Sequence, residues 1–600
     1  MWADDYSYNY DHAAGPLSLR PIPLSAKFCR QQAERFLQAQ GLTMPQVDYL
    51  AGIFDDDDRL LACGGLDGAL IKGLAVSEEA RDLHLAARLV THLRAHALEA
   101  GHVHVRVFTK PCYIPLFRNM GFSLIGQSRG AALLDTDRHA LERYLVPLRS
   151  LAPDEGRIGV IVMNANPLTK GHRYLLEQAA AQCDFLVVIP VGENVHNLFS
   201  YAERSEMLQA ALATLPRTAL APASIYAVSA STFPTYFIKE HSARSEAHIE
   251  LDLDIFVRHI APALRATVRF VGSEPTDPLT AAYNAAMHRL LPPAGIEVVE
   301  IERCSPGAGD SRPISASRLR DHLLHGRTAE ALRLAAPEAV PAVLAEAAAT
   351  ALRTELDLTP KPGLVDRDNA GAHTDMDHAL MAGSIRALRP TFLAVARACH
   401  RAEAPDAARL RQLGLEGEQR MLRVTGGVNT HRGALFALGL TLAAAAHLYY
   451  KEQAIRPDAL RAAIAALAAG FVQPAGTHGA RVRETYQVGG ALGNALGGYA
   501  PLFDEWLPFL EEHAASPHAL HLLLLLIVSQ LDDTNLLHRG GAERTASARA
   551  EAAEVLAHFS PEALRALDAR FTADNLSPGG AADMLSLTFL IRGLVSSPKS

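Results

Sequence analysis

Directly after an apolar run at residues 159–163, nine residues bring together amide, hydroxyl and imidazole side chains and a glycine: Asn164, Asn166, Thr169, Gly171 and His172. The apolar run predicts a short buried strand, and the residues that follow predict a helix with His172 in its first turn. Unpaired backbone N–H groups and the positive helix end favour phosphate there. An imidazole adds a hydrogen bond or a charge where a pentavalent phosphorus develops, and Gly171 lets the backbone approach the ligand. The alternative interpretation is a helix start that serves only as a cap.

A second polar motif lies about 140 residues downstream, at residues 314–320, and reads Ile-Ser-Ala-Ser-Arg-Leu-Arg. It opens another helical stretch. The hydroxyls of Ser315 and Ser317 and the guanidinium groups of Arg318 and Arg320 suit the β- and γ-phosphates of a nucleoside triphosphate. We therefore expect the two motifs to meet around one triphosphate.

The chain from residue 342 to 600 has a different pattern. Its Ala/Leu-rich stretches have helical periodicity without β-branched alternation, which predicts an all-α domain. Connections in helix bundles are ordinarily short and rarely carry repeated charged residues, so the polar clusters that interrupt these helices need an explanation. Six such clusters lie at residues 359–366, 371–377, 426–433, 476–481, 532–541 and 577–583.

The six clusters supply two kinds of chemistry. The carboxylates suited to Mg²⁺ shared with substrate phosphates are Asp375, Asp377, Asp532 and Asp533. The side chains suited to a polyphosphate are Lys361, His431, Arg432, His478, Arg481, His538 and Arg539. For any single one of them a cap or a solvated turn is the plainer interpretation. Six clusters in one helical domain nevertheless favour a polyphosphate site.

Composition and charge exclude several classes of protein. The 600 residues predict three or four domains, and 49% hydrophobic with 20% charged residues is ordinary for a globular chain. A formal charge of -8 without any Lys/Arg-rich run argues against nucleic acid and anionic membrane as partners. Six scattered cysteines without C-x-x-C spacing are expected to be reduced thiols of a cytoplasmic protein.

Two further patterns bear on membranes and secretion. Asp4 and Asp5, with no apolar segment behind them, exclude a signal peptide. The longest apolar run, residues 522–528, is far shorter than the ~20 residues that a membrane helix needs. We expect it to be a core helix.

Two boundaries predict a multidomain chain. Residues 151–156, Leu-Ala-Pro-Asp-Glu-Gly, separate segment 1–150 from segment 155–338, and prolines at 337 and 341 precede segment 342–600. The first segment has strand-like runs at 49–54, 59–64, 70–76 and 103–108, with one long helix expected from about 78 to 101. This predicts an α+β N-terminal domain.

The T-x-G-H and I-S-x-S-x-x-R pair resembles the two signatures of the HxGH nucleotidyltransferase superfamily, whose fold is α/β and Rossmann-like. The segments between the motifs resemble [citrate (pro-3S)-lyase] ligase. They are Phe185 to Val191, residues 231–237 (Ser-Thr-Phe-Pro-Thr-Tyr-Phe), 250–252 with 255–256, and 271–275 with 283–284. Thr169 replaces the first His of the commoner signature, and Ala316 stands where many relatives carry a hydroxyl.

The ligase resemblance implies a two-step acyl transfer. Acetate attacks the α-phosphorus of ATP to give acetyl-AMP and pyrophosphate, and the acetyl group then passes to the prosthetic-group thiol of the citrate lyase acyl carrier protein. His172 would stabilise the α-phosphoryl charge beside Thr169. Ser315, Ser317, Arg318 and Arg320 would hold the leaving pyrophosphate.

The N-terminal segment resembles the GNAT acyltransferase fold in its strand order and in residues 119–122, Asn-Met-Gly-Phe. GNAT enzymes bind acyl-CoA pyrophosphate on a [QR]-x-x-G-x-[GA] loop, and the matching residues here are 81–86, Arg-Asp-Leu-His-Leu-Ala. His84 in the glycine position would crowd a phosphate and Asp82 would repel it. We expect a non-catalytic or altered-ligand domain.

The C-terminal segment resembles triphosphoribosyl-dephospho-CoA synthase. The matching motifs are T-P-K-P-G-L-V-D, G-A-H-x-D-M-D, G-x-N-T-H-R-G and D-T-N-L-x-x-R-G-G. The resemblance implies that the 2'-hydroxyl of 3'-dephospho-CoA attacks C1'' of ATP and expels adenine. A carboxylate would stabilise the oxocarbenium-like state or accept the hydroxyl proton. Asp375, Asp377 and Asp533 are the candidates, with Mg²⁺ on the triphosphate.

The two resemblances share one client, citrate lyase, so the sequence predicts a bifunctional maturation enzyme. It would use ATP in both reactions, with Mg²⁺, acetate, 3'-dephospho-CoA and the acyl carrier protein as further partners. Two alternatives stay open. One is an adenylyltransferase that acts on a pantetheine-like acceptor, and the other is a nucleotide-binding scaffold with decayed sites.

Overall fold

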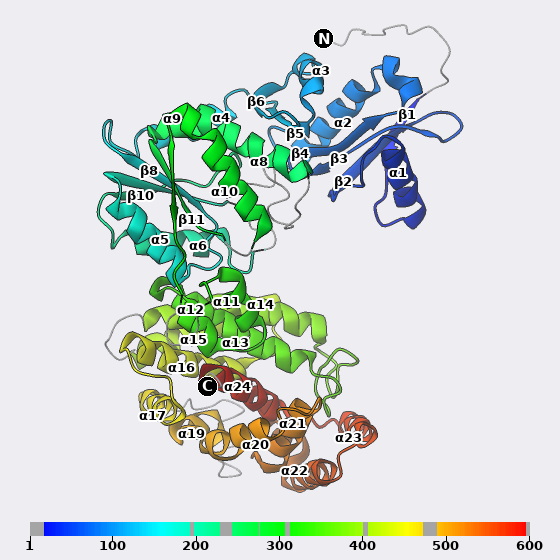
Figure 1. Ribbon diagram of the computed structural model, residues 1–600. Coiled ribbons are helices and arrows are strands. Elements are labelled where there is room, and N and C mark those ends of the chain that lie inside the picture. The colour runs from blue at the N-terminus through cyan, green and yellow to red at the C-terminus, as the bar shows by residue number, and fades with distance from the viewer. Residues whose placement is uncertain are drawn as a thin grey trace, which may run out of the picture. The chain divides into compact units, whose positions relative to one another are not determined.

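The computed structural model describes residues 17–192, 197–228, 243–274, 277–305, 312–399, 406–471 and 489–595. They form two compact units: residues up to 164 with 175–197 and 212–303, and residues 165–174, 198–211 and 304 onward. The first unit is mixed α/β and the second is largely helical (Figure 1). Because these units cut across the three predicted segments, the division at 150, 338 and 342 stays a prediction.

The first sheet of unit one has seven strands, and only β4 and β5 pair in parallel. Its order is β1 (Ser18–Pro21), β2 (Tyr49–Phe54), β3 (Leu60–Asp67), β4 (Leu70–Val76), β5 (Arg106–Thr109), β7 (Ala132–Asp135) and β6 (Ser123–Gln127). Successive side chains of β2 face opposite sides of the sheet. Ala51 and Ile53 pack with α2 (Leu85–Glu99), and Leu50 and Phe54 pack with α1 (Lys27–Ala39). The short helix α3 (Ile114–Asn119) precedes β6.

The long helix expected from 78 to 101 is divided, which corrects that prediction. A 3₁₀ turn, η1 (Glu78–Leu83), is followed by His84 with φ of 51° and then by α2. A left-handed residue interrupts the helical hydrogen-bond ladder, so one continuous helix cannot form. The strand runs at 49–54 and 70–76 are confirmed, and the run at 103–108 begins later, at Arg106.

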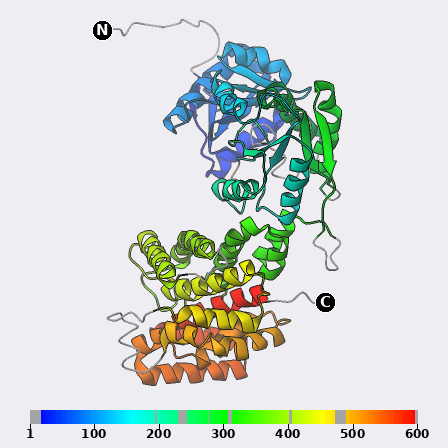
Figure 2. The ribbon, with the colours of Figure 1, turned by 90° about the vertical axis from the view of Figure 1, so that its left-hand side faces the viewer.

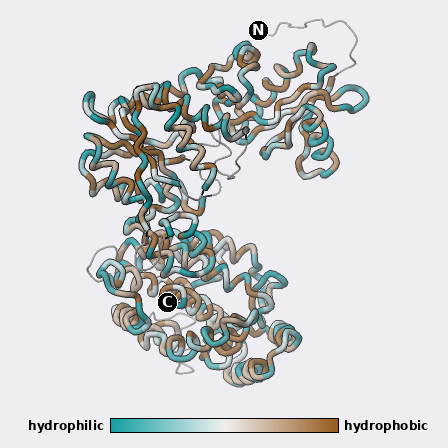
Figure 3. Tube along the Cα trace, viewed as in Figure 1, coloured by the Kyte–Doolittle hydropathy of each residue, from teal (hydrophilic) through white to brown (hydrophobic). Residues whose placement is uncertain are grey.

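The second sheet of unit one has five parallel strands. Its order is β10 (Thr218–Leu220), β9 (Phe185–Pro190), β8 (Ile158–Met163), β11 (Val268–Gly272) and β12 (Glu297–Ile301). β8 confirms the strand predicted at 159–163. The central strands β8 and β9 are almost uniformly apolar and mostly buried (Figure 3), as expected for strands covered on both faces. The chain leaves β8 toward β9 and β10 and later returns to β11 on the other side.

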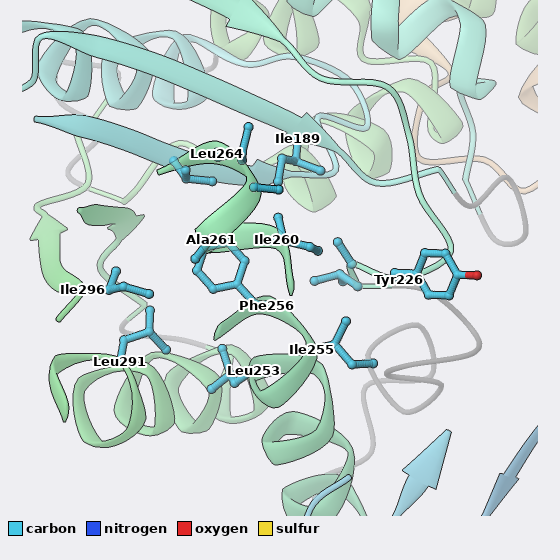
Figure 4. Close-up of a cluster of buried hydrophobic side chains, with 14 of the residues drawn as sticks. Ile189, Tyr226, Leu253, Ile255, Phe256, Ile260, Ala261, Leu264, Leu291 and Ile296 are labelled. Carbon is cyan, nitrogen blue, oxygen red and sulfur yellow. The ribbon is translucent and has the colours of Figure 1, made fainter. Parts of the chain in front are cut away.

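One hydrophobic core joins the two sheets within this unit. It includes Leu145 of α4 (Ala140–Arg149) and Leu253 of α8 (Ala243–Ile255). Figure 4 shows the part around Phe256, where Ile260, Leu264 and Leu291 gather and the hydroxyl of Tyr226 points away. The Ser128 hydroxyl also donates to the Ala247 carbonyl over 2.9 Å. This core has residues on both sides of the predicted boundary at 151–156, and that boundary stays a prediction.

The sheet region contains further helices. They are η3 (Phe256–Ile260, a π-helical turn), α9 (Ala261–Leu264), α10 (Pro278–Leu290) and the 3₁₀ turn η4 (Pro292–Ala294). Helix α5 (Lys170–Ala181) confirms the helix predicted from residue 171, and it begins in the second unit.

Helices build the second unit. They are α6 (Tyr201–Leu212), α11 (Ala316–Leu324), α12 (Thr328–Leu334), η5 (Pro337–Ala339), α13 (Val340–Asp357), α14 (His378–Ala398), α15 (Ala407–Val424), α16 (Arg432–Tyr450), α17 (Pro457–Ala468), α19 (Gly490–Leu496), η6 (Leu502–Trp506, π-helical), α20 (Leu507–Glu512), α21 (Ala519–Gln530), α22 (Thr534–Ala557), α23 (Pro561–Ala573) and α24 (Gly579–Val595). In Figure 2, α24 (red) lies among the other helices of this unit. The all-α prediction for residues 342–600 is confirmed for the described residues.

Two of these helices are strongly apolar for packing reasons. α21 confirms the core helix expected at 522–528, since Leu523, Leu524 and Ile527 are buried. α16 is long and apolar enough to cross a membrane, but 72% of its apolar window is buried within the protein. That burial is typical of the central helix of a bundle.

A buried ion-pair network ties α6 to the bundle. Arg389 of α14 bonds Glu203 of α6 and Glu346 of α13, each over 2.5 Å. Glu346 is 2% exposed and also pairs with Arg353. Buried charges of this kind are stable only when they are paired, so α6 is held against α13 and α14.

Candidate active sites

The first site is built on a reciprocal pair of hydrogen bonds at the start of α5. The His172 backbone N–H donates to the Thr169 hydroxyl over 3.2 Å, and the Thr169 backbone N–H donates to His172 Nδ1 over 3.1 Å. Thr169 is 1% exposed. This arrangement is a capping box with an imidazole in place of the usual carboxylate. The capping interpretation of these residues is thus part of the geometry.

The pair also fixes the state of the imidazole. Nδ1 of His172 accepts a hydrogen bond, so the network assigns the ring proton to Nε2. His172 therefore presents an N–H donor and no formal charge. Of the two roles expected for this residue, the geometry favours the hydrogen bond.

The structure brings the two predicted phosphate motifs together. Gly171 lies against Ile314, because a Cβ added at Gly171 would stand 3.4 Å from the Ile314 Cβ. Ser315 is the N-cap residue of α11, and its hydroxyl lies 2.8 Å from that of Ser317. The Ser315 hydroxyl makes no side-chain cap bond. Both α5 and α11 thus begin beside a hydroxyl residue, Thr169 and Ser315 respectively. Two helix N-termini at one place favour an anion.

The remaining polar residues of this site hold its loops. The Asn166 side chain, which is buried, accepts the Phe199 N–H over 3.1 Å, and the Asn166 carbonyl accepts a bond from Arg320. Arg318 donates to the Pro313 carbonyl over 3.3 Å. Asn164 belongs to the first unit, where its amide donates to Asn197 over 3.1 Å. Among the described residues, both arginines thus contact loop carbonyls in addition to any part in binding phosphate.

The second site is a cavity of about 780 Å³ in the helical unit. Five of the predicted clusters contribute to its lining, those at residues 359–366, 371–377, 426–433, 532–541 and 577–583. Its polar and charged lining residues include Glu355, Lys361, His373, Glu418, Asn429, Thr430, His431, Arg432, Asp532, Asp533, Asn535, Arg539 and Asp583. The structure therefore brings together most of the residues selected from the sequence.

His431 is held in one tautomer by a short relay. The Thr430 hydroxyl donates to Ser384 Oγ over 2.7 Å, which leaves the Ser384 proton for His431 Nδ1 at 2.9 Å. Nε2 then carries the ring proton, and this buried atom has no hydrogen-bond partner among the described residues. Burial, reinforced by nearby Lys361, lowers the pKa of His431 to about 3. His431 is thus a neutral N–H donor in the cavity wall.

Lys361 is part of a buried ion pair. Its ammonium bonds the Glu355 carboxylate, and both side chains are almost fully buried. Burial raises the pKa of Glu355, and Lys361 opposes that shift. A ligand would therefore meet Lys361 as one half of a pair rather than as an isolated cation.

The remaining predicted phosphate-binding residues have different surroundings. Arg432 pairs with Glu418 at the start of α16. Arg539 donates to the Ala372 carbonyl over 2.8 Å and to His373 over 3.2 Å. His478 and Arg481 lie outside the described residues.

The predicted metal ligands are mostly occupied by other partners. Asp533 caps α22 through Asn535 N–H at 2.8 Å and also accepts Ala581 N–H of α24 over 2.9 Å. Asp532 pairs with Arg549, and Asp377 caps α14. Asp375 is 3.7 Å from His373 and, like Asp377, is not part of the cavity lining. Over the part of the chain that the structure describes, no three metal-ligating side chains converge.

The structure adds four positions to this site that were not singled out from the sequence: Glu355, Ser384, Gly433 and Asp583. Glu355 and Ser384 lie inside helices, where a polar residue gives no motif signal. Gly433 and Asp583 lie in clusters that the sequence singled out, but only the pairing of 426–433 with 577–583 in space shows their relationship.

Two family models match consecutive parts of the chain. A family model for the citrate lyase ligase C-terminal domain matches residues 158–342. A model for ATP:dephospho-CoA triphosphoribosyl transferase matches residues 341–599.

Individual relatives match each part at about the same level. The [Citrate [pro-3S]-lyase] ligase of Klebsiella pneumoniae is 39% identical over 297 residues, which cover 49% of this chain and 86% of the relative. That of Escherichia coli is 43% identical over 275 residues, or 44% of this chain and 76% of the relative. The 2-(5''-triphosphoribosyl)-3'-dephosphocoenzyme-A synthase of Klebsiella pneumoniae is 40% identical over 260 residues, or 41% of this chain and 93% of the relative. The chain belongs to both families, with the citrate lyase ligase part first and the triphosphoribosyl-dephospho-CoA synthase part after it.

Proposed function

We propose that this chain is a bifunctional citrate lyase maturation enzyme. Its synthase part makes the precursor of the citrate lyase prosthetic group, and its ligase part acetylates the thiol of that group on the acyl carrier protein. The observation that carries the proposal is the presence of two separate polar sites, each built from the motifs of a different family.

In the ligase reaction, acetate attacks the α-phosphorus of ATP, and pyrophosphate leaves. His172, as an Nε2–H donor, binds a non-bridging oxygen of the α-phosphoryl group as charge develops there. The N-termini of α5 and α11, with the hydroxyls of Ser315 and Ser317, hold the leaving pyrophosphate. Arg320 supports the same loop through the Asn166 carbonyl. The acetyl group of acetyl-AMP then passes to the carrier thiol.

In the synthase reaction, the 2'-hydroxyl of 3'-dephospho-CoA attacks C1'' of ATP in the 780 Å³ cavity, and adenine leaves. The donors His431 and Arg539 and the start of α16 at Arg432 suit the triphosphate. Mg²⁺ would accompany the triphosphate, because it usually keeps phosphate and water ligands and needs only one or two carboxylates. Asp532, exposed at the cavity wall, is the better placed candidate, since both oxygens of Asp533 already accept backbone N–H groups.

The N-terminal sheet resembles a GNAT fold that has lost its acyl-CoA site. β4 and β5 run parallel, and His84 occupies the left-handed position before α2 that glycine adopts at least cost. The side chain of Asp82 lies outside the described residues. We assign this region a structural role, and titration with acetyl-CoA should detect no micromolar binding.

We expect a cytoplasmic enzyme, so two assays on the full chain at neutral pH test the proposal. ATP with acetate should give AMP and pyrophosphate, and ATP with 3'-dephospho-CoA and Mg²⁺ should give free adenine. Pyrophosphate release without acetate dependence would favour adenylyl transfer to another acceptor. Loss of both reactions in a folded chain would favour a scaffold.

A further inference from the structure

Five carboxylates line the large cavity, and four of them have committed partners. Glu355 pairs with Lys361, and Glu418 pairs with Arg432. Asp532 pairs with Arg549, and Asp533 accepts backbone N–H groups at the starts of α22 and α24. The fifth, Asp583, has no cationic partner among the described residues.

Asp583 instead lies over the start of α16. A Cβ added at Gly433 would stand 2.0 Å from Asp583 Oδ2, so only glycine leaves room for this carboxylate. Among the described residues, the Ala434 N–H is its hydrogen-bond donor, and its electrostatic neighbours are Asp533, Glu355 and the Tyr499 hydroxyl. A carboxylate amid two others and without a cation favours its neutral, protonated form. Burial and these two neighbours hold the pKa of Asp583 well above its usual range.

Asp583 lines the large cavity next to a wall that this cavity shares with a second one. A second cavity of about 430 Å³ adjoins the first, and both are lined by Gly490, Asn494, Leu531, Asp532 and Met584. Met584 follows Asp583 directly in α24. Ribosyl transfer needs ATP and its acceptor bound at once, so the reacting atoms belong at a shared wall of this kind.

Tyr499 lines the second cavity. Its φ is 52°, a strained conformation for a tyrosine, and its buried hydroxyl has no hydrogen-bond partner among the described residues. Strain of this kind costs about 1–3 kcal/mol and clusters at ligand sites.

We propose that Asp583 is the catalytic general acid that protonates the departing adenine. This inference rests on the synthase function proposed above. The bond from the acceptor 2'-oxygen to C1'' forms as the bond from C1'' to N9 breaks, and its electron pair goes to the adenine ring. Asp583 gives its proton to a ring nitrogen of adenine. The acceptor hydroxyl loses its proton to water, and water returns a proton to Asp583, so atoms and charge balance. General acids of this kind contribute about 10²–10⁴-fold to a rate.

The test compares two donors in full-length wild type and Asp583→Asn. One donor is ATP, and the other is ATP methylated at N7 of adenine, whose base leaves without a proton. With ATP, Asp583→Asn should release adenine about 10²–10⁴-fold more slowly. With methylated ATP, the variant should release methyladenine within about tenfold of wild type, because the acid is no longer needed.

Equal losses with both donors, or an unchanged rate with ATP, would overturn the assignment. Acetate-dependent AMP formation by the same preparation reports that the variant is folded. If Asp583→Asn does not fold, Gly433→Ala carries the same comparison, because its methyl group displaces the carboxylate. Asp504→Asn, a surface carboxylate paired with Arg461, is the matched control and should behave as wild type. Absence of adenine release by wild type would instead reject the proposed function.

Discussion

Ser384 hydrogen-bonds Nδ1 of His431 over 2.9 Å and so sets the tautomer with which His431 faces the cavity. The same logic holds at the other site, where the Thr169 N–H occupies Nδ1 of His172. Both histidines are therefore neutral donors, positioned by a neighbour that does not itself need to contact substrate.

Removing the Ser384 hydroxyl should weaken ATP binding in the synthase site only. Ser384→Ala leaves His431 free to place its proton on either nitrogen, which costs the order of one hydrogen bond, or about 1 kcal/mol. We expect a roughly three- to tenfold higher KM for ATP in adenine release. The KM for ATP in the ligase reaction is the internal control, and an equal rise there would contradict a local role.

His172→Ala should abolish most of the ligase reaction. Loss of one preorganised donor to a developing oxyanion costs about 10²–10³-fold in rate. Acetate-dependent AMP formation should fall by this factor while adenine release stays at the wild-type rate. Thr169→Val, which keeps the shape but removes the hydroxyl that caps His172 N–H, should show a smaller loss. Near-wild-type acetyl-AMP synthesis by His172→Ala would reject the assignment.

Asp533→Asn should lower stability more than it changes metal dependence. The two carboxylate oxygens accept N–H groups from two helices, and an amide can place an oxygen at only one of them. The amide nitrogen would then face the other backbone N–H, donor against donor. This should lower the free energy of unfolding by about 1–3 kcal/mol, measured by chemical denaturation. Asp504→Asn serves as the surface control. A rate loss that excess Mg²⁺ restores, without loss of stability, would instead identify Asp533 as a metal ligand.

The N-terminal region should stabilise the ligase part through their common core. Leu145 of α4 is buried there, whereas its neighbour Val146 is 56% exposed. Leu145→Ala should cost about 2–5 kcal/mol and Val146→Ala about 0.5 kcal/mol or less. Thermal unfolding and the temperature at which AMP formation is lost should move together. Equal effects of the two substitutions would show that α4 does not share this core.

Acidification should destabilise the helical unit through His431. The folded pKa of about 3 lies below the ordinary 6.5, so between these values the unfolded chain takes up a proton that the folded chain does not. The contribution of neutral His431 is complete above pH 6.5 and falls by about 1.4 kcal/mol per pH unit below it. As the pH is lowered below 6.5, the melting temperature of His431→Asn should fall less steeply than that of wild type. His558→Asn, at an exposed histidine, should keep the wild-type slope.

Local sequence patterns predicted the elements near the sites more closely than their partners. β8 and α5 follow from apolar periodicity and a helix start, which are encoded within a few residues. The break at His84 was missed because a left-handed histidine has no reliable pattern. The Asp583–Gly433 pair could not be predicted, since it depends on how two helix starts 150 residues apart pack. Asp533 showed the opposite difficulty, because a motif carboxylate looks the same in sequence whether it binds a metal or caps a helix.

The ion pair between Glu203 and Arg389 also has a consequence for how the chain folds during synthesis. The two residues are 186 positions apart, so Glu203 leaves the ribosome well before its partner. At elongation rates of about 5–20 residues per second, residues 198–211 wait roughly 10–40 seconds for α14. Residues 165–174, with Thr169 and His172, belong to the same late-completed unit. The ion pair that holds α6 against the helical bundle is therefore completed only after the first helices of the synthase part have been translated.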